Sequence, residues 1–237
     1  MAKIDLEKRA EKVRIVLEKK NIKTVPPTRV GLALDISGST RGMYHDGVMQ
    51  EAVNRLQAVA MRFDDNKELD MWSFSNGFNR LVSATPNDCE DYVERRILND
   101  REVDKWHGTS YAPVMEDILE FYFKGEVRKA GGLFGLFGKT QRVAPANANV
   151  PAMCLFVTDG ANDDRRQAAE VLRRSQDQAI YWQLIGVGPA REFGFIREMA
   201  DELPNVGFVN LSSLSMSDEA LYDQLLNDEL CGWVKGR

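Results

Sequence analysis

Short apolar segments that alternate with helical patterns are the feature that most constrains the fold of this chain. Six such segments are Arg29–Asp35, Leu69–Phe74, Arg80–Ser83, Val150–Thr158, Ile180–Val187 and Val206–Asn210. Their lengths suit strands, and those that are apolar throughout suit strands buried on both faces. Between them, apolar residues recur about every 3.6 positions, which predicts helices. This order predicts a mostly parallel sheet wrapped by helices.

The predicted helices follow from apolar stripes and from capping residues. The stripes lie within residues 4–19, 48–63, 114–122, 168–172 and 196–203. Asn87 is expected to cap a helix that runs through Arg96, with Glu90 in the capping-box position. Ser217 is expected to cap a final helix with acidic residues in its first turn. Residues 36–47, rich in glycine and hydroxyl side chains, are expected to form a loop.

A turn sequence separates Leu69–Phe74 from Arg80–Ser83. Asn76-Gly77 is typical of a hairpin, with Phe78 at the turn, so the second of these strands should run antiparallel at the sheet edge. The predicted fold class is α/β: a Rossmann-like, doubly wound, mostly parallel sheet with one antiparallel edge strand and helices on both faces.

The chain is expected to form one main domain preceded by a helix. Residues 1–25 should form an amphipathic helix packed on or appended to the domain, because Pro26 and Pro27 end any helix before them. Residues 26–237 should form the domain. Residues 125–149 form a glycine-rich insertion without a clean period, and loops of this length are usually functional or disordered.

Composition argues against several classes of function. The net charge of −5 is unlike that of a general nucleic-acid binder, which needs a basic surface. No run approaches about 18 consecutive apolar residues, so no membrane span is expected, and the charged N-terminus is unlike a signal peptide. Cys89, Cys154 and Cys231 form no CxxC pair and are expected to be reduced thiols. We therefore expect a cytoplasmic protein.

Oxygen-bearing side chains gather where the predicted strands end. Asp35, Ser37 and Ser39 alternate in the loop that leaves the first strand, Thr109 precedes a helix, and Asp159 follows the fourth strand of the predicted sheet. If the strand order is 3-2-1-4-5-6, the first and fourth strands are neighbours at the switch point where ligands bind. Mg²⁺ prefers oxygen ligands. The sequence therefore predicts one divalent-metal site.

The order DxSxS, then T, then TDG resembles the metal-ion-dependent adhesion site of the von Willebrand factor A family. The resemblance implies that Ser37, Ser39 and Thr109 bind the ion through their hydroxyls. It implies that Asp35 and Asp159 bind directly or through water, and that one position is left for an acidic group of a partner. Mg²⁺ is the expected ion, with Mn²⁺ or Ca²⁺ as alternatives.

Longer stretches look like the A-domain of TerF-type tellurium (toxic-cation) resistance proteins. They are Leu6–Lys20, the run Arg62-Phe-Asp-Asp before Leu69-Asp-Met-Trp-Ser-Phe, Thr109-Ser-Tyr-Ala-Pro-Val-Met and Ser217–Leu226. The similarity covers nearly the whole chain apart from residues 125–149. It implies a bacterial or phage cytoplasmic protein of a stress or tellurium-resistance system.

The expected function is a protein-interaction module that grips a partner's Asp or Glu through the metal, and not an enzyme. The alternatives are a metal-dependent hydrolase that uses the same ion as a Lewis acid and a structural scaffold. Phosphoryl-transferring hydrolases carry an acid two residues after the aspartate that ends their first strand. In this chain that position is Ser37, so the general acid is missing. No nucleotide is expected: Gly138-Lys139-Thr140 looks like the end of a P-loop, but Leu133 occupies the position of its first glycine.

Other residues are candidates for the surroundings of the site. We expect its possible rim to contain His45, His107, Gly108, Gly160 and Asn162. Leu133, Phe134, Leu136 and Phe137, in a glycine-rich context, could form a partner-binding loop or pack against the protein's own surface. Asp163 and Asp164 could add negative potential, but we favour a role in charging the first turn of the next helix.

Overall fold

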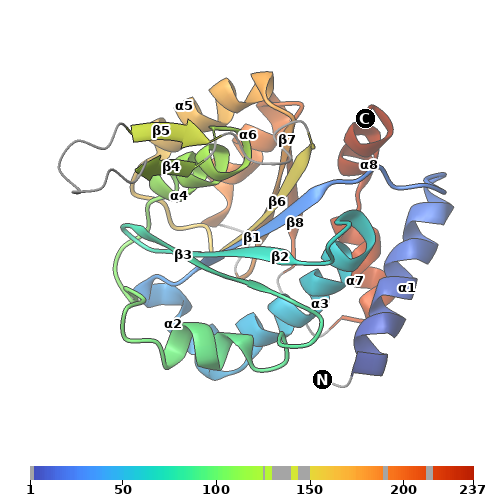
Figure 1. Ribbon diagram of the computed structural model, residues 1–237, viewed down its shortest axis with the longest axis horizontal. Coiled ribbons are helices and arrows are strands. Elements are labelled where there is room, and N and C mark those ends of the chain that lie inside the picture. Colours follow the sequence, from blue (N-terminus) through green and yellow to red (C-terminus); the bar gives the residue numbers. More distant parts are fainter. Residues whose placement is uncertain (1–2, 125, 130–139, 144–149, 189–191, 212–215) are drawn as a thin grey trace.

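A computed structural model describes residues 3–124, 126–129, 140–143, 150–188, 192–211 and 216–237. Six strands form its main sheet in the order β3-β2-β1-β6-β7-β8 (Figure 1). They are β1 Arg29–Asp35, β2 Leu69–Phe74, β3 Phe78–Ala84, β6 Ala152–Thr158, β7 Ile180–Gly186 and β8 Val206–Asn210. All neighbours pair in parallel except β2 and β3. The predicted fold class is confirmed, including the antiparallel edge strand.

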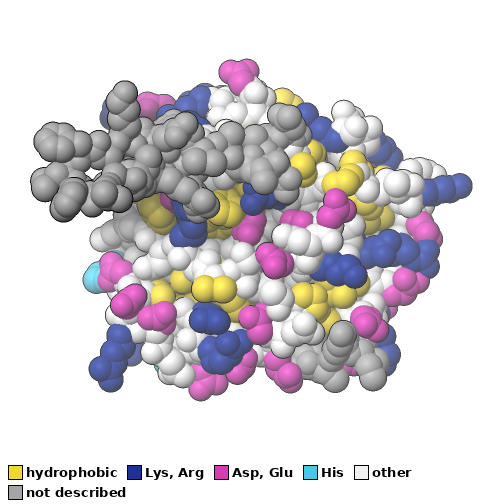
Figure 2. All heavy atoms as spheres, in the orientation of Figure 1, with side chains coloured by type: hydrophobic (Ala, Val, Ile, Leu, Met, Phe, Trp, Pro, Cys, Tyr) yellow, Lys and Arg dark blue, Asp and Glu magenta, His cyan; other side chains and the backbone are white. Residues whose placement is uncertain are grey.

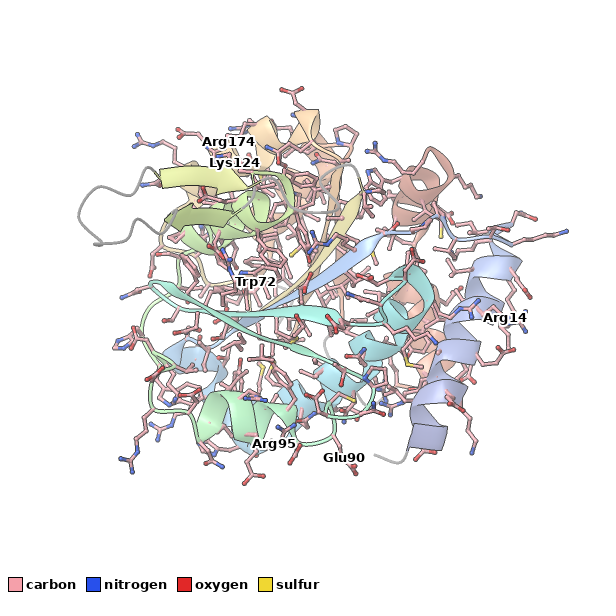
Figure 3. The ribbon with its side chains drawn as sticks, viewed as in Figure 1. Arg14, Trp72, Glu90, Arg95, Lys124 and Arg174 are labelled. Carbon is pink, nitrogen blue, oxygen red and sulfur yellow. The ribbon has the colours of Figure 1, made fainter. Side chains whose placement is uncertain are left out.

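Helices cover both faces of this sheet (Figure 1). One buried cluster joins the sheet to α1 Lys3–Lys19, α3 Val48–Phe63, α7 Asp218–Leu225 and α8 Asp228–Lys235. A second cluster joins the opposite face to α4 Ala112–Leu119, α5 Arg165–Arg174 and α6 Gly194–Glu202. Trp72 belongs to this second cluster and lies near the middle of the molecule in Figure 3. Each face of the sheet is thus buried, as the apolar strands predict.

Short helical segments complete the description. They are η1 Gly38–Thr40, α2 Arg41–His45, the π-helical η2 Glu94–Leu98 and η3 Glu120–Lys124, and η4 Ser175–Asp177. The expectation of a plain loop over residues 36–47 is therefore wrong, because η1 and α2 fold most of it into helical turns. A run of only five residues in α2 is too short to show a periodic apolar stripe.

The predicted helix cap at Asn87 is also wrong. Helical structure begins at Tyr92, and Asn87 lies in a turn. The Thr85 N–H and hydroxyl both donate to Asp88 Oδ1, at 2.7 and 2.8 Å, so local side-chain bonding holds this backbone in a non-helical conformation. By contrast, Ser217 caps α7 as predicted, since its hydroxyl accepts from the Ala220 N–H.

Three elements, two short strands and the helix α8, were not predicted from the sequence. The insertion contains an antiparallel pair, β4 Glu126–Lys129 and β5 Thr140–Val143. Each strand has four residues and lacks an apolar alternation long enough to be seen in sequence. Helix α8 is capped by Asn227, whose side chain accepts from the Leu230 N–H, and Gly232 interrupts its pattern.

The N-terminal helix α1 packs against α3 and α7. Its buried face consists of Leu6, Ala10, Val13, Val16 and Leu17. At the border of this contact Arg9 pairs with Glu51 of α3, and Lys12 pairs with Asp218 of α7. Arg14 projects from the outer face of α1 in Figure 3 and pairs with acidic residues of the same helix.

The described surface mixes charges of both signs. On the face shown in Figure 2, basic and acidic side chains are interspersed and leave small apolar areas between them. Among the helices of the described ranges, none is both long and apolar enough to cross a membrane.

Removing the buried Leu17 side chain should destabilise the whole domain. Leu17 is 1 % exposed, so Leu17→Ala should lower the free energy of unfolding by about 2–5 kcal/mol through lost burial and a cavity. Ile15→Ala is the matched control, because Ile15 lies on the same helix and is 40 % exposed. Urea denaturation checks both. Equal, small effects in the two variants would contradict the packing of α1.

Candidate metal centre

The candidate site lies where β1 and β6 end side by side. The two strands pair in parallel with Leu34 opposite Val157, so Asp35 and Thr158 end at the same edge of the sheet. The loops that follow them carry Ser37 and Asp159. This is the switch point of the sheet, since chain connections from β1 and β6 lead away in opposite directions.

Asp35 is a fully buried carboxylate at this edge. Its Oδ1 accepts the Ser37 N–H at 2.9 Å, and its Oδ2 accepts the Thr158 hydroxyl at 2.8 Å. Burial above all, together with the nearby charge of Asp159, raises the pKa of Asp35 to about 6 against the opposing hydrogen bonds from Ser37 and Thr158. In the part of the chain that the structure describes, no basic side chain forms an ion pair with Asp35 or Asp159.

The two predicted serine ligands converge beside Asp35. Ser37 Oγ lies 3.1 Å from Ser39 Oγ; Ser37 is buried, and Ser39 is exposed. The turn that brings them together is anchored from behind, because the hydroxyls of Thr40 and Tyr44 both donate to the Asp35 carbonyl, at 3.1 and 2.9 Å. The turns of η1 and α2 thus aim the serine hydroxyls at one side of the loop.

A second loop is tied to this turn by backbone hydrogen bonds. Trp106 N–H donates to the Ile36 carbonyl, and Gly38 N–H donates to the His107 carbonyl, both at 2.9 Å. Trp106 has φ of 71°, a costly conformation for a bulky residue, and such strain persists only where the surroundings hold it. Three residues later, Thr109 is buried at 3 % exposure.

A side chain at Gly108 would displace two polar side chains of other segments. A Cβ there would lie 2.5 Å from Asn76 Oδ1 and 2.8 Å from Asp163 Oδ2. The missing side chain therefore lets the loop approach two other segments closely before it reaches Thr109.

The third loop begins at Thr158 and carries Asp159, which is partly exposed. Asp159 Oδ1 accepts the Ala161 N–H at 3.2 Å. Gly160 has φ of 95°, and a Cβ there would meet the Glu192 carbonyl at 2.6 Å, so glycine is required. The Gly160 N–H donates to Thr158 Oγ1 at 3.1 Å.

Thr158 is a residue whose role the sequence did not reveal. Its buried hydroxyl contacts Asp35 Oδ2, Tyr111 Oη and the Gly160 N–H, and so connects all three loops. The available signal was its position immediately before Asp159 at a strand end. Tyr111 carries no such signal, because its partner lies far away in the sequence.

The candidate rim residues lie in different surroundings. His45 stacks on Trp106 with ring centroids 6.3 Å apart and lines a cavity of about 560 Å³ beside α2. The His107 side chain is exposed, and its Nε2 lies 2.8 Å from Asp104 Oδ1. Its carbonyl accepts the Gly38 N–H. Asn162 Oδ1 accepts the Asp164 N–H at 2.7 Å. Leu133, Phe134, Leu136 and Phe137 lie outside the described residues.

The favoured interpretation of Asp163 and Asp164 is wrong. Helix α5 starts at Arg165, and the Asp164 side chain makes no capping bond to it. Instead, the Asp164 carboxylate accepts the Tyr111 and Ala112 N–H groups, both at 2.8 Å, and so caps α4. Asp163 Oδ2 accepts the Thr109 N–H at 3.1 Å. Both aspartates therefore hold the loop that contains Thr109.

The residues at this edge fit a hard divalent cation. They offer the carboxylates of Asp35 and Asp159 and the hydroxyls of Ser37, Ser39 and Thr109, which are all oxygen donors. A buried carboxylate without a cationic partner is costly, and a metal ion would remove that cost. Among the described residues, no cluster of three or more His, Cys, Asp or Glu could hold a metal. A metal at this edge would therefore depend on hydroxyl ligands.

The fold and the oxygen-lined loops are those of a von Willebrand factor A (vWA) domain. The chain belongs to the vWA-TerF-like family, the vWA domains found in the TerF C terminus, whose model matches residues 27–141 and 136–237. It is also 35% identical over 240 residues to the Bacillus subtilis (strain 168) protein YcbR, described as uncharacterized. That match covers 99% of this chain and 88% of YcbR.

Solved structures resemble the chain in fold. Proximal thread matrix protein 1 from the mussel byssus, with a zinc-occupied MIDAS motif, matches with a TM-score of 0.53 at 14% identity. The match covers 88% of this chain and 49% of the mussel protein, so the chain spans about half of that length. Manganese-loaded Plasmodium vivax TRAP protein matches with a TM-score of 0.52 at 14% identity, covering 86% of this chain and 73% of TRAP.

The raised pKa of Asp35 predicts how the metal-free protein responds to pH. The folded state binds the Asp35 proton more tightly than the unfolded state does. This proton therefore stabilises the folded state fully below the ordinary pKa near 3.9, and the stabilisation is lost as pH rises through about 6. Between about pH 4.5 and 7.5 the natural protein should therefore lose about 2 kcal/mol relative to Asp35→Asn.

Urea unfolding in the presence of a chelator, for both proteins at both pH values, measures this difference. The Asn variant is the control, since it keeps an acceptor for the Ser37 N–H but cannot ionise, and all other titrating groups are shared. Stability curves that change with pH in parallel would show that folding does not raise the pKa of Asp35.

Proposed function

We propose that this chain is a protein-binding module that uses one divalent cation, Mg²⁺ in the cell, to hold an Asp or Glu side chain of a partner. The observation that carries the proposal is the buried Asp35 carboxylate, which has no basic partner among the described residues, with Ser37 and Ser39 beside it. Two carboxylates would largely neutralise the ion. The neutral hydroxyls would leave it electrophilic enough to attract one more anionic group.

The proposed ligands would hold the ion partly from buried positions and partly from exposed ones. Asp35 and Ser37 are buried, whereas Ser39 is exposed and Asp159 partly so. A partner would therefore reach the ion from the side of Ser39 and Asp159. The charge pairing with the ion would anchor the partner, and the surrounding loops would select it.

The choice of ion rests on donor chemistry. Zinc occupies the motif of the mussel protein and manganese is loaded in TRAP, which supports a divalent cation here. Mg²⁺ is preferred because all five proposed ligands bind through oxygen, with no Cys or His among them. Mn²⁺ and Ca²⁺ would use the same oxygen ligands.

The cellular setting is proposed from the family. The description of the family names TerF, and we propose a role in a bacterial or phage stress or tellurium-resistance system. We also propose a cytoplasmic location, which suits the three buried, free cysteines among the described residues.

Partner capture should depend on both the metal and the exposed serine. Immobilised natural protein should retain a specific partner from the source cell's extract in Mg²⁺ and release it into chelator. Ser39→Ala should lose this retention, because it removes a ligand without cutting into the core. Ser83→Ala, a change on β3 far from the loops, should behave like the natural protein.

A second step tests the carboxylate itself. Replacing the retained partner's contacting Asp or Glu by Asn or Gln should abolish binding as completely as chelation does. If the partner is retained equally well in the presence of chelator and by the Ser39→Ala variant, the proposal is contradicted. Metal-dependent hydrolysis of the captured molecule would instead favour the hydrolase.

A further inference from the structure

Asp163 and Thr109 are joined by two reciprocal hydrogen bonds. Asp163 Oδ2 accepts the Thr109 N–H at 3.1 Å, and the Asp163 N–H donates to the Thr109 carbonyl at 2.8 Å. The residues are 54 positions apart in the chain. Both polar groups of the Thr109 backbone are therefore fixed by one residue of the loop that follows β6.

The residues on either side of this contact continue the same attachment. Asp164 binds the N–H groups of Tyr111 and Ala112, which begin α4, and Asn162 in turn binds the Asp164 N–H. The segment from Thr109 to Ala112 is thus hydrogen-bonded to Asp163 and Asp164 of the loop that follows β6. These two aspartates belong to the same loop as Asp159, four and five positions after it, so the Thr109 loop and the Asp159 loop are held to each other here.

We propose that Asp163 is a positioning residue of the metal centre, which sets the place of the Thr109 hydroxyl relative to Asp159 without binding the ion itself. This inference rests on the proposed metal site and extends it beyond the five ligands. One of its carboxylate oxygens, Oδ2, is already used by the Thr109 N–H.

Thr109 needs such a restraint because of the residue before it. Gly108 has no side chain to limit its backbone, and the space beside its Cα is filled by Asp163 Oδ2 and Asn76 Oδ1. Without the Asp163 acceptor, the buried Thr109 would lose a hydrogen-bond partner and the loop could rotate at Gly108. A hydroxyl ligand that is not held in place binds a metal more weakly.

The competing explanation is electrostatic. Asp163 is exposed and carries a negative charge, which could attract a cation without positioning anything. The two roles differ in what Asn can replace. Asp163→Asn removes the charge but keeps an oxygen acceptor for the Thr109 N–H, whereas Asp163→Ala removes both.

The test is calorimetric titration of the chelator-treated full chain with Mg²⁺. Asp163→Ala should weaken binding about tenfold or more, the range for partners that orient metal ligands, while Asp163→Asn should stay within about threefold of the natural protein. Asp104→Ala is the matched control, because it removes an exposed carboxylate from the preceding loop segment without touching Thr109. It should leave affinity unchanged.

Amide exchange of Thr109 in the metal-free protein provides a readout that needs no metal. Exchange should be slow in the natural protein and in Asp163→Asn, and at least about tenfold faster in Asp163→Ala. Equal losses of affinity in the Asn and Ala variants would overturn positioning in favour of charge. Unchanged affinity in Asp163→Ala, even with a lower melting temperature, would reduce Asp163 to a structural role.

The outcomes also separate this inference from the proposed function. If the natural protein binds Mg²⁺ and both variants bind it equally well, only the positioning role fails. If the natural protein binds no Mg²⁺, the metal-dependent function fails and the positioning role fails with it. The exchange data would then show only that Asp163 holds a loop.

Discussion

The burial of Asp35, with no basic partner in the described part of the chain, is the constraint on which the rest of the site depends. A carboxylate inside a protein must be protonated, paired or bound to a metal, and the raised pKa of Asp35 reflects that cost. The neighbouring structure stabilises this charge only in part, through hydrogen bonds donated by the Ser37 N–H and the Thr158 hydroxyl. A metal ion held by this carboxylate and the serine hydroxyls would balance the remainder. The fold thus retains an unfavourable group where it can serve binding.

The architecture and the main ligand positions could be predicted because their signals are local. Most strands of the sheet are mainly apolar runs, and each proposed ligand lies at the end of a strand, in the turn that follows one, or shortly before a helix. Once the strand order makes β1 and β6 neighbours, their parallel pairing brings their carboxyl ends together. Asp35 and Asp159 therefore approach each other for a reason that the sequence contains. The hairpin at Asn76-Gly77 follows from turn chemistry in the same way.

The supporting contacts could not be predicted because their partners are distant in the chain. Thr158 with Tyr111, and Asp163 with Thr109, are hydrogen-bonded pairs that no spacing rule connects. The two acidic residues after Asn162 resemble an ordinary charged helix start. Only the folded structure shows that they accept backbone N–H groups of Thr109 and of the start of α4 instead. Short elements failed for another reason. The five residues of α2 and the four-residue strands of the insertion are shorter than the window in which periodicity is visible.

The most direct test of the metal centre is an anomalous diffraction measurement on crystals of the full chain soaked with Mn²⁺, which substitutes for Mg²⁺ in oxygen sites. We predict one strong peak between the ends of β1 and β6, about 2.0–2.3 Å from the Ser37 and Ser39 hydroxyls and close to Asp35, Thr109 and Asp159. Crystals of Asp35→Ala should lack it. A peak elsewhere on the protein, or none at this edge in well-ordered natural crystals, would contradict the account that these five residues form a metal-binding site.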